Sequence, residues 1–343
     1  MNLLTKQADP EWLSAVNEWV GEQLARRNII ATGPPAAVRV MPWSAVYRFP
    51  TGGGDVYFKA CGPSQAHEPG LAAWLAAARP DCMIPVLAAD TARGWLLLPD
   101  GGATLTPLIN EPPGEVGHWS SVLTLQAGVQ RDLLPRAAEL LALGVLDRRT
   151  TLLPGLLAAL LDRPDKLLLG EPEAITADGL THLRALGPRF NDLCAELAAG
   201  GPPDTFVHDD FHEDHIFAAR RPDGSWRYTF FDFGDACISH PFTQLVSQPR
   251  FAGHRFENVL DDTQKILREI YLSQWADFAP SATRQRALDL ALIVGCVIRA
   301  LTWVNACGDY LDEIPAELRA AYGSRLAFWL LQIGARVEAL DAA

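Results

Sequence analysis

The sequence lacks the paired cysteines that mark disulfide frameworks and zinc ribbons. Its six cysteines, at positions 61, 82, 194, 237, 296 and 307, are scattered in mostly apolar surroundings, and none forms a C-x-x-C pair. No continuous apolar run reaches about 18 residues, the length that spans a bilayer. The N-terminus, with Lys6, Asp9 and Glu11, has no signal-peptide core. We therefore expect reduced core thiols, no membrane association and a cytoplasmic location.

Positive charge is scarce as well. Lys and Arg total 29 against 41 Asp and Glu, which gives a formal net charge of -12 at pH 7. Such a chain is a poor candidate for nucleic-acid binding, because that affinity comes largely from basic contacts with phosphates. Its field weakly favours cationic small molecules. With 49% hydrophobic residues and neither an internal repeat nor a low-complexity linker, the chain is expected to be globular.

Glycine-rich phosphate-binding motifs are also missing. The run Gly52-Gly53-Gly54 has neither the G-x-G-x-x-G spacing nor a following G-K-[ST], so we interpret it as a hairpin turn. Around it, alternating apolar residues predict an antiparallel sheet, preceded by an amphipathic helix at 9–27. The expected strands are residues 38–41, 46–49, 56–60, 84–89 and 94–99.

Beyond Gly102, leucine and alanine recur at helical spacing, interrupted by Pro154, Pro164 and Pro172. The expected helices are residues 116–143, 152–161, 180–199, 261–275, 283–306 and 316–338. The pattern predicts an α+β chain of two lobes. Residues 1–102 would form a small sheet-based lobe, and residues 103–343 a larger, mainly helical one.

Side chains capable of chemistry are concentrated between residues 205 and 235. The segment His208-Asp209-Asp210-Phe211-His212-Glu213-Asp214-His215 precedes a predicted hairpin that ends in Phe231-Asp232-Phe233-Gly234-Asp235. Such a hairpin would bring Asp232 back beside Asp210 and His215. This arrangement fits metal-assisted phosphoryl transfer, in which one carboxylate accepts a hydroxyl proton and others hold the ions. Two alternatives remain open: a zinc site built on the histidines, and a polar loop whose aspartates cap turns.

The pattern His208-x-Asp210-x-His212-x-x-His215, with Asp232 in its Phe-Asp-Phe-Gly-Asp setting, resembles the catalytic loop and metal-binding aspartate of the aminoglycoside phosphotransferase and choline kinase family. The resemblance implies a protein-kinase-like two-lobed fold, with Asp210 as the catalytic base and Asp232 as a metal ligand. His215 stands where the family usually has asparagine as the second metal ligand. The resemblance therefore makes His215 the other candidate ligand, and it puts the choice between Mg²⁺ and Mn²⁺ in question.

By the same resemblance, the nucleotide binds to residues 1–102. Lys59 would hold its phosphates, and Glu68 would orient Lys59 through an ion pair. Ser44 lies in the turn that corresponds to the phosphate-covering loop. The adenine would contact the hinge-like residues Leu97, Leu98 and Pro99. Without the resemblance, Lys59 would be interpreted as a solvated strand lysine and the hinge as an ordinary buried strand.

A second departure concerns an aspartate that relatives carry slightly after the metal-binding strand, where it braces the catalytic loop. This chain has Thr243-Gln244-Leu245 in that region, so we expect a different brace. His208 and His212 are expected to support the loop, and His240 to be a structural hydrogen-bonding residue. The segment 309–313 is acidic, with Asp309, Asp312 and Glu313. It would either attract an amine or form solvated surface.

We interpret the chain as an ATP-dependent kinase that phosphorylates a hydroxyl group of a small molecule, with Mg²⁺ or Mn²⁺ as the metal. The two departures support an alternative, a pseudokinase-like protein that binds nucleotide without transferring phosphate. A zinc hydrolase would leave Lys59 and the hinge-like strand without a role. The sequence identifies neither the acceptor nor the oligomeric state, and it does not separate ATP from GTP.

Overall fold

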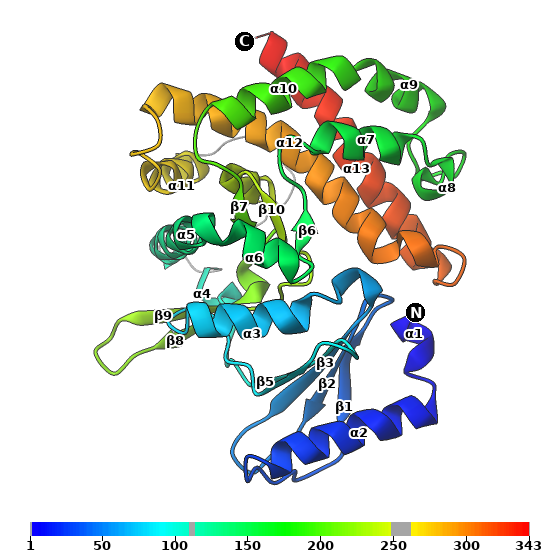
Figure 1. Cartoon of the computed structure of the whole chain (residues 1–343), viewed down its shortest axis with the longest axis vertical. Coiled ribbons are helices and arrows are strands. Elements are labelled where there is room, and N and C mark those ends of the chain that lie inside the picture. The colour runs from blue at the N-terminus through cyan, green and yellow to red at the C-terminus, as the bar shows by residue number, and fades with distance from the viewer. Residues whose placement is uncertain (1, 110–113, 248–261, 343) are drawn as a thin grey trace. The chain divides into compact units, whose positions relative to one another are not determined.

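The computed structural model describes residues 2–109, 114–247 and 262–342, which form two compact units (Figure 1). The first unit consists of Met1–Thr104, His215–Gly234 and Asp309–Ile314, and the second of Leu105–Asp214, Asp235–Gly308 and Pro315–Ala343. This division differs from the expected boundary at residue 102, because the hairpin after the catalytic loop belongs to the first unit. The chain passes from one unit to the other between Asp214 and His215.

The first unit contains an antiparallel five-stranded sheet in the order β1-β2-β3-β5-β4. Its strands are β1 (Ala36–Val40), β2 (Ser44–Phe49), β3 (Val56–Cys61), β4 (Ala88–Asp90) and β5 (Trp95–Pro99). The expected meander and its closure to five strands are confirmed. The strand expected at 84–89 shortens to three residues, because Met83 and Ile84 pair with Phe230 instead.

One helix covers this sheet, as Figure 1 shows, and its sequence explains both its start and its buried face. Helix α2 (Pro10–Ala25) follows a short helix α1 (Leu3–Lys6), and Asp9 caps it by accepting the Glu11 N–H at 3.0 Å. Proline at the first position costs no hydrogen bond there. The ring of Trp19 packs edge-on against Phe58 and Trp95, with centroids 5.9 and 5.6 Å away. Burial of these aromatic rings forms the core of the unit.

Two further elements complete the first unit. Helix α3 (Glu68–Ala78) follows β3, and the hairpin β8 (Ile216–Arg220) and β9 (Trp226–Phe230) turns at Gly224, where φ is +85°. The Phe230 N–H donates to the Cys82 carbonyl at 2.7 Å, and the Ile84 N–H donates to the Phe230 carbonyl at 3.0 Å. These backbone bonds attach the hairpin to the N-terminal segment.

The second unit is mainly helical, as expected. Its helices are α4 (Thr106–Ile109), α5 (Gly114–Leu133), α6 (Ala137–Ala142), α7 (Leu153–Leu161), α8 (Pro164–Leu167), α9 (Ala177–Ala185), α10 (Gly187–Ala199), α11 (Asp262–Ser273), α12 (Ser281–Cys307) and α13 (Ala316–Asp341). Two expected helices are each divided, near Pro135 and at Gly187-Pro188, because proline lacks the N–H that a continuous helix requires.

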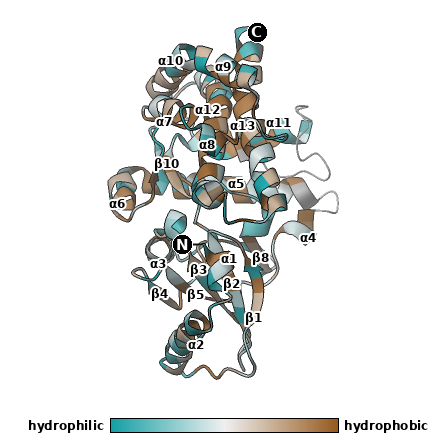
Figure 2. Ribbon diagram, turned by 90° about the vertical axis from the view of Figure 1, so that its right-hand side faces the viewer, coloured by the Kyte–Doolittle hydropathy of each residue, from teal (hydrophilic) through white to brown (hydrophobic). Residues whose placement is uncertain are grey.

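Helix α12 is largely hydrophobic (Figure 2), and by length and composition it could cross a membrane. However, 78% of its most apolar stretch is buried inside the protein, as in the core helix of a globular fold. Beside the helices lies a small sheet of β6 (Leu146–Asp147), β10 (Cys237–Ser239) and β7 (Thr205–Val207), in that order. Strand β7 leads directly into His208, so this sheet fixes the start of the segment 208–215.

Candidate active site

Lys59 is the centre of a buried charge cluster in the first unit. Its Nζ atom lies 2.6 Å from Oε2 of Glu68 and 2.8 Å from Oδ1 of Asp232. Only 7% of Lys59 and 1% of Glu68 is exposed. The interpretation of Lys59 as a solvated strand lysine is therefore wrong, and the sequence correctly paired it with Glu68.

Glu68 is held in place by several donors. Besides Lys59, it accepts the Phe233 backbone N–H at 3.1 Å and faces the Cys61 thiol at 3.3 Å. Burial raises the pKa of Glu68, although Lys59 opposes that rise. Burial also disfavours the ammonium group, but Asp232 and Glu68 outweigh it and raise the pKa of Lys59 well above its ordinary value. Lys59 is therefore positively charged at neutral pH.

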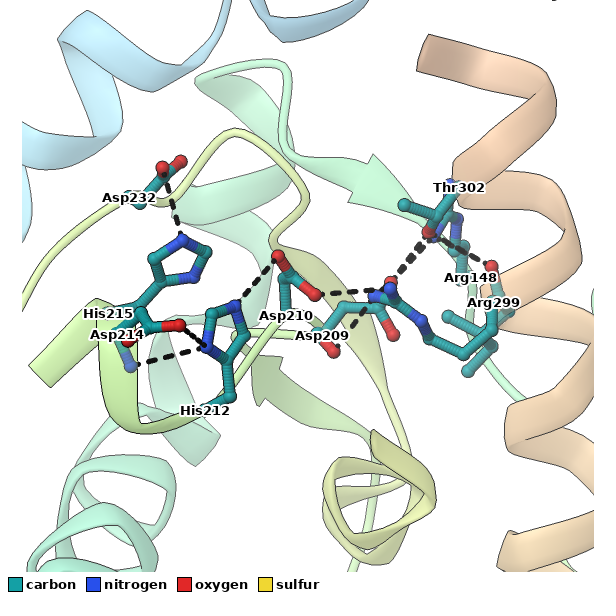
Figure 3. Close-up of polar contacts among 10 residues, drawn as sticks. Arg148, Asp209, Asp210, His212, Asp214, His215, Asp232, Arg299 and Thr302 are labelled. Atoms are coloured by element: carbon teal, nitrogen blue, oxygen red, sulfur yellow. Dashed lines mark hydrogen bonds and ion pairs between the residues drawn. The ribbon is translucent and has the colours of Figure 1, made fainter. Parts of the chain in front are cut away.

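Asp232 and His215, the two candidate metal ligands, come together within the first unit. The Phe231 N–H donates to the His215 carbonyl at 3.3 Å, just beyond the hairpin pair of Ile216 and Phe230, which brings the next residue, Asp232, close to His215. The Nε2 atom of His215 lies 3.5 Å from Oδ2 of Asp232, and Figure 3 draws this contact as a dashed line. Asp232 adopts a left-handed backbone conformation, with φ +65°, which is unusual for a residue with a side chain.

These two side chains suit a divalent cation. A carboxylate oxygen and an imidazole nitrogen are both common ligands of transition metals, whereas Mg²⁺ prefers oxygen alone. The second oxygen of Asp232 already contacts the ammonium group of Lys59. These two donors therefore fit one divalent cation. Because one donor is an imidazole nitrogen, the site should favour Mn²⁺ more than a site with oxygen ligands alone would.

Asp210, the candidate base, lies in the second unit and is contacted from two sides (Figure 3). Its Oδ1 accepts from Nη2 of Arg299 at 3.1 Å, and its Oδ2 lies 3.5 Å from Nε2 of His212. The backbone N–H of Asp214 donates to Nδ1 of His212 at 3.3 Å. An acceptor role for Nδ1 implies that the ring proton is on Nε2, facing Asp210. His212 therefore supports the loop, as expected.

The neighbouring Asp209 is almost fully buried, with 2% exposed, and its φ is +62°. Its Oδ2 accepts from the Thr302 hydroxyl at 2.6 Å and from Nη1 of Arg299 at 3.1 Å, and it lies 3.5 Å from Nη1 of Arg148. The sequence analysis assigned no role to Asp209, Arg148, Arg299 or Thr302. The available signal was an arginine and a threonine three residues apart in the otherwise apolar stretch 290–304 of α12.

Gln244 contacts the start of the segment 208–215 and is our candidate for the different brace expected there. Its Oε1 accepts the His208 backbone N–H at 2.9 Å, and both residues are buried. The amide group of Gln126 approaches the same oxygen at 3.4 Å. His240, expected to be structural, accepts the Phe242 N–H at 3.2 Å, and burial lowers the pKa of His240 to about 3. The start of the catalytic loop is thus fixed by neutral groups.

The remaining candidates lie in the first unit. Ser44 begins β2, is buried, and its carbonyl accepts the Met41 N–H at 2.8 Å. Leu97 packs in the core of the unit, whereas Leu98 and Pro99 are half-buried at the end of β5. The acidic residues of the 309–313 segment are exposed, which agrees with the interpretation of that segment as solvated surface.

The model of the phosphotransferase enzyme family matches residues 43–280 of this chain. No curated protein sequence matches this chain.

Solved structures resemble the chain over almost its whole length. A macrolide 2'-phosphotransferase type I aligns with a TM-score of 0.58 at 16% identity, covering 91% of this chain and 97% of that one. A choline kinase from Streptococcus pneumoniae aligns with a TM-score of 0.57 at 12% identity, covering 93% of this chain and 99% of that one. A GDP complex of aminoglycoside 2'-phosphotransferase-IIIa aligns with a TM-score of 0.56 at 13% identity, covering 94% of this chain and 98% of that one. At these identities the likeness shows a shared fold, and the expected kinase-like class is confirmed.

Proposed function

The chain belongs to the phosphotransferase enzyme family, and from this premise we propose that it transfers the γ-phosphoryl group of ATP to a hydroxyl group of a small molecule. The observation that carries the proposal is the buried arrangement in which Lys59 contacts both Glu68 and Asp232. Burying a lysine with two carboxylates costs free energy of desolvation, and such clusters of interacting ionisable groups are concentrated at functional sites.

Each residue of the first unit has a distinct task in this proposal. Lys59 binds the phosphates of the nucleotide, and Glu68 keeps its ammonium group in position. Asp232 and His215 hold the divalent cation, which when bound neutralises charge on the phosphates. Leu98 and Pro99 lie at the end of β5, where the base of the nucleotide would bind.

In the second unit, Asp210 orients the acceptor hydroxyl group and takes up its proton on a carboxylate oxygen. The hydroxyl oxygen then forms a bond to the γ-phosphorus as the bond from that phosphorus to the β-phosphate oxygen breaks. ADP leaves with the electron pair of the broken bond. Positioning and charge stabilisation supply most of the rate acceleration in such reactions.

We propose a cationic acceptor. Choline and aminoglycosides, named in the descriptions of two similar structures, are positively charged, and the net charge of -12 favours encounter with a cation. The six cysteines are all buried and none is bonded to another, in keeping with a cytoplasmic location. We expect no nucleic-acid partner.

A pseudokinase-like nucleotide-binding protein is the second candidate, and His215 at the second ligand position is the observation that favours it. In that case the nucleotide would bind but the phosphoryl group would not be transferred. A zinc hydrolase gains no support, because it gives the buried pair of Lys59 and Glu68 no role.

The test is a nucleotide-consumption screen with ATP and GTP, each with Mg²⁺ or Mn²⁺. The acceptor panel consists of aminoglycosides, macrolides, choline-like alcohols, sugars and nucleosides. We expect acceptor-dependent ADP or GDP release that the Asp210→Asn variant lacks. Thermal-shift titration separates the alternatives: stabilisation by nucleotide with no turnover for any acceptor supports the pseudokinase, and stabilisation by zinc alone contradicts both.

A further inference from the structure

We propose that Arg299 is a positioning residue for Asp210, an inference that rests on the proposed role of Asp210 as the base. From helix α12, its guanidinium group contacts two successive residues of the catalytic loop with different nitrogen atoms. Nη1 donates to the backbone carbonyl and to Oδ2 of Asp209, each at 3.1 Å. Nη2 donates to Oδ1 of Asp210 at 3.1 Å.

This geometry requires arginine. A guanidinium group is planar and presents its donors in a fixed fork, so two nitrogens can serve two acceptors at once in a defined direction. A lysine ammonium is a single point charge on a flexible stem. Lysine at position 299 could neutralise one carboxylate but could not hold both Asp209 and Asp210 in the same orientation.

Helix α12 provides a rigid base for the guanidinium group. Arg299 is only 8% exposed, and its neighbours in the chain, Ile298 and Ala300, are fully buried. Burial opposes the charge, but Asp209, Asp210 and Asp235 outweigh it and raise the pKa of Arg299. The side chain is therefore a fixed, permanent cation.

Asp209 keeps Arg299 directed at the loop. It is paired with two arginines, since Arg148 lies 3.5 Å from the same oxygen. A glycine would adopt the observed φ of +62° with less strain, but it would offer no carboxylate. The strained backbone places that carboxylate where it fixes Arg299, and Arg299 in turn fixes Oδ1 of Asp210.

Thr302 makes it possible to separate positioning from simple anchoring of the loop. One turn along α12, its hydroxyl donates to Oδ2 of Asp209 at 2.6 Å. Among the described residues, its hydroxyl also contacts Arg148 and the Ile298 carbonyl, and it makes no contact with Asp210. Thr302→Val thus weakens the anchor but leaves the bond from Arg299 to Asp210 in place.

The experiment combines crystal structures with steady-state kinetics for wild type, Arg299→Lys and Thr302→Val. Arg286→Lys is the matched control, because Arg286 lies on the same helix but pairs with Glu196 on the surface, at 2.6 Å. In Arg299→Lys we expect the Asp210 carboxylate to leave its wild-type rotamer. We also expect kcat to fall on the order of 10²-fold, as misplaced catalytic groups do, with the nucleotide KM unchanged. Thr302→Val and Arg286→Lys should keep the Asp210 rotamer.

Two results would overturn the inference. One is an Arg299→Lys crystal structure in which Asp210 keeps its wild-type rotamer. The other is an equal fall of kcat in Thr302→Val, which would mean that Arg299 acts through the fold of the loop. If Arg299→Lys does not fold, Arg299→Gln serves for the same comparison. Absence of turnover in wild type would refute the proposed function only, because the crystal structures still decide whether Arg299 positions Asp210.

Discussion

The ammonium nitrogen of Lys59 lies 2.6 Å from a carboxylate oxygen of Glu68, and both side chains are buried. Removal of one member of such a pair leaves a buried charge with less compensation. We expect Glu68→Ala to lower the free energy of unfolding by about 3 kcal/mol, measured by urea denaturation. In the control, Glu196→Ala breaks the exposed pair with Arg286. This variant should change the free energy of unfolding by less than about 1 kcal/mol. Equal effects would show that burial does not set the strength of the Lys59 pair.

Asp210→Asn should abolish transfer and spare nucleotide binding. The amide keeps the size of the side chain but cannot accept the hydroxyl proton, so kcat should fall about 10²-fold or more. The residues that we propose to bind the phosphates and the cation are in the first unit and are unchanged, so the nucleotide KM should stay as in wild type. Steady-state kinetics test this against Asp178→Asn, an exposed aspartate on α9. A variant with more than about a tenth of wild-type turnover contradicts the assignment of Asp210 as base.

His215→Asn should change the preferred metal. Imidazole suits Mn²⁺ better than Mg²⁺, whereas an amide oxygen suits Mg²⁺. We expect wild type to be more active with Mn²⁺ and the variant to shift toward Mg²⁺. Titration of each ion by isothermal calorimetry in the presence of a non-hydrolysable nucleotide gives a second measurement that does not need turnover. Identical metal preferences in the two proteins would exclude His215 as a ligand.

His240 should make stability depend on pH. Its pKa is about 3 in the folded protein and near 6.5 in an unfolded chain. Between these values the unfolded chain binds a proton that the folded protein does not, so stability is full above pH 6.5 and falls as the pH decreases.

The expected contribution is at most about 1.4 kcal/mol per pH unit below pH 6.5. Urea denaturation from pH 7.5 to 5 measures it. His240→Asn retains an acceptor for the Phe242 N–H but has no titrating group, and its stability should fall less steeply. Parallel curves for the two proteins would contradict the low pKa of His240.

Gln244→Leu should destabilise the protein, because it removes the acceptor of the buried His208 N–H. An unsatisfied buried donor costs about 1–3 kcal/mol. Gln244→Glu is the matched control, because it keeps an oxygen that can accept the His208 N–H. In thermal and urea unfolding, wild type should have a higher stability than the leucine variant. If the leucine variant is as stable as wild type, Gln244 is not the brace.

Much of the fold could be predicted because its signals are local. The alternation around Gly52-Gly53-Gly54 predicted β2 and β3, and the spacing of apolar residues predicted α2 and α12. The segment 84–89 failed because its pairing is not local. Residues 83 and 84 pair with Phe230 in a hairpin far along the chain, and no period in the sequence encodes that choice.

The candidate site shows the same limit. The motif identified Asp210 and Asp232, and it pointed to the pair of Lys59 and Glu68, which the structure brings together. Arg299 was missed because it lies 90 residues beyond Asp209. Within the apolar stretch 290–304 of α12, its charge had no visible partner in the sequence. The role of Gln244 was equally hidden, since an amide accepting a backbone N–H leaves no pattern in the sequence.

The left-handed backbone at Asp209 and Asp232 sets a limit on engineering. Consensus or stability-guided redesign tends to place glycine or asparagine where φ is positive, because these residues adopt that conformation at low cost. At both positions such a choice would relieve backbone strain but would delete a carboxylate that contacts a buried cation. Libraries built for thermostability should therefore hold Asp209 and Asp232 constant, because a rule based on φ alone ignores the buried cations that their carboxylates compensate.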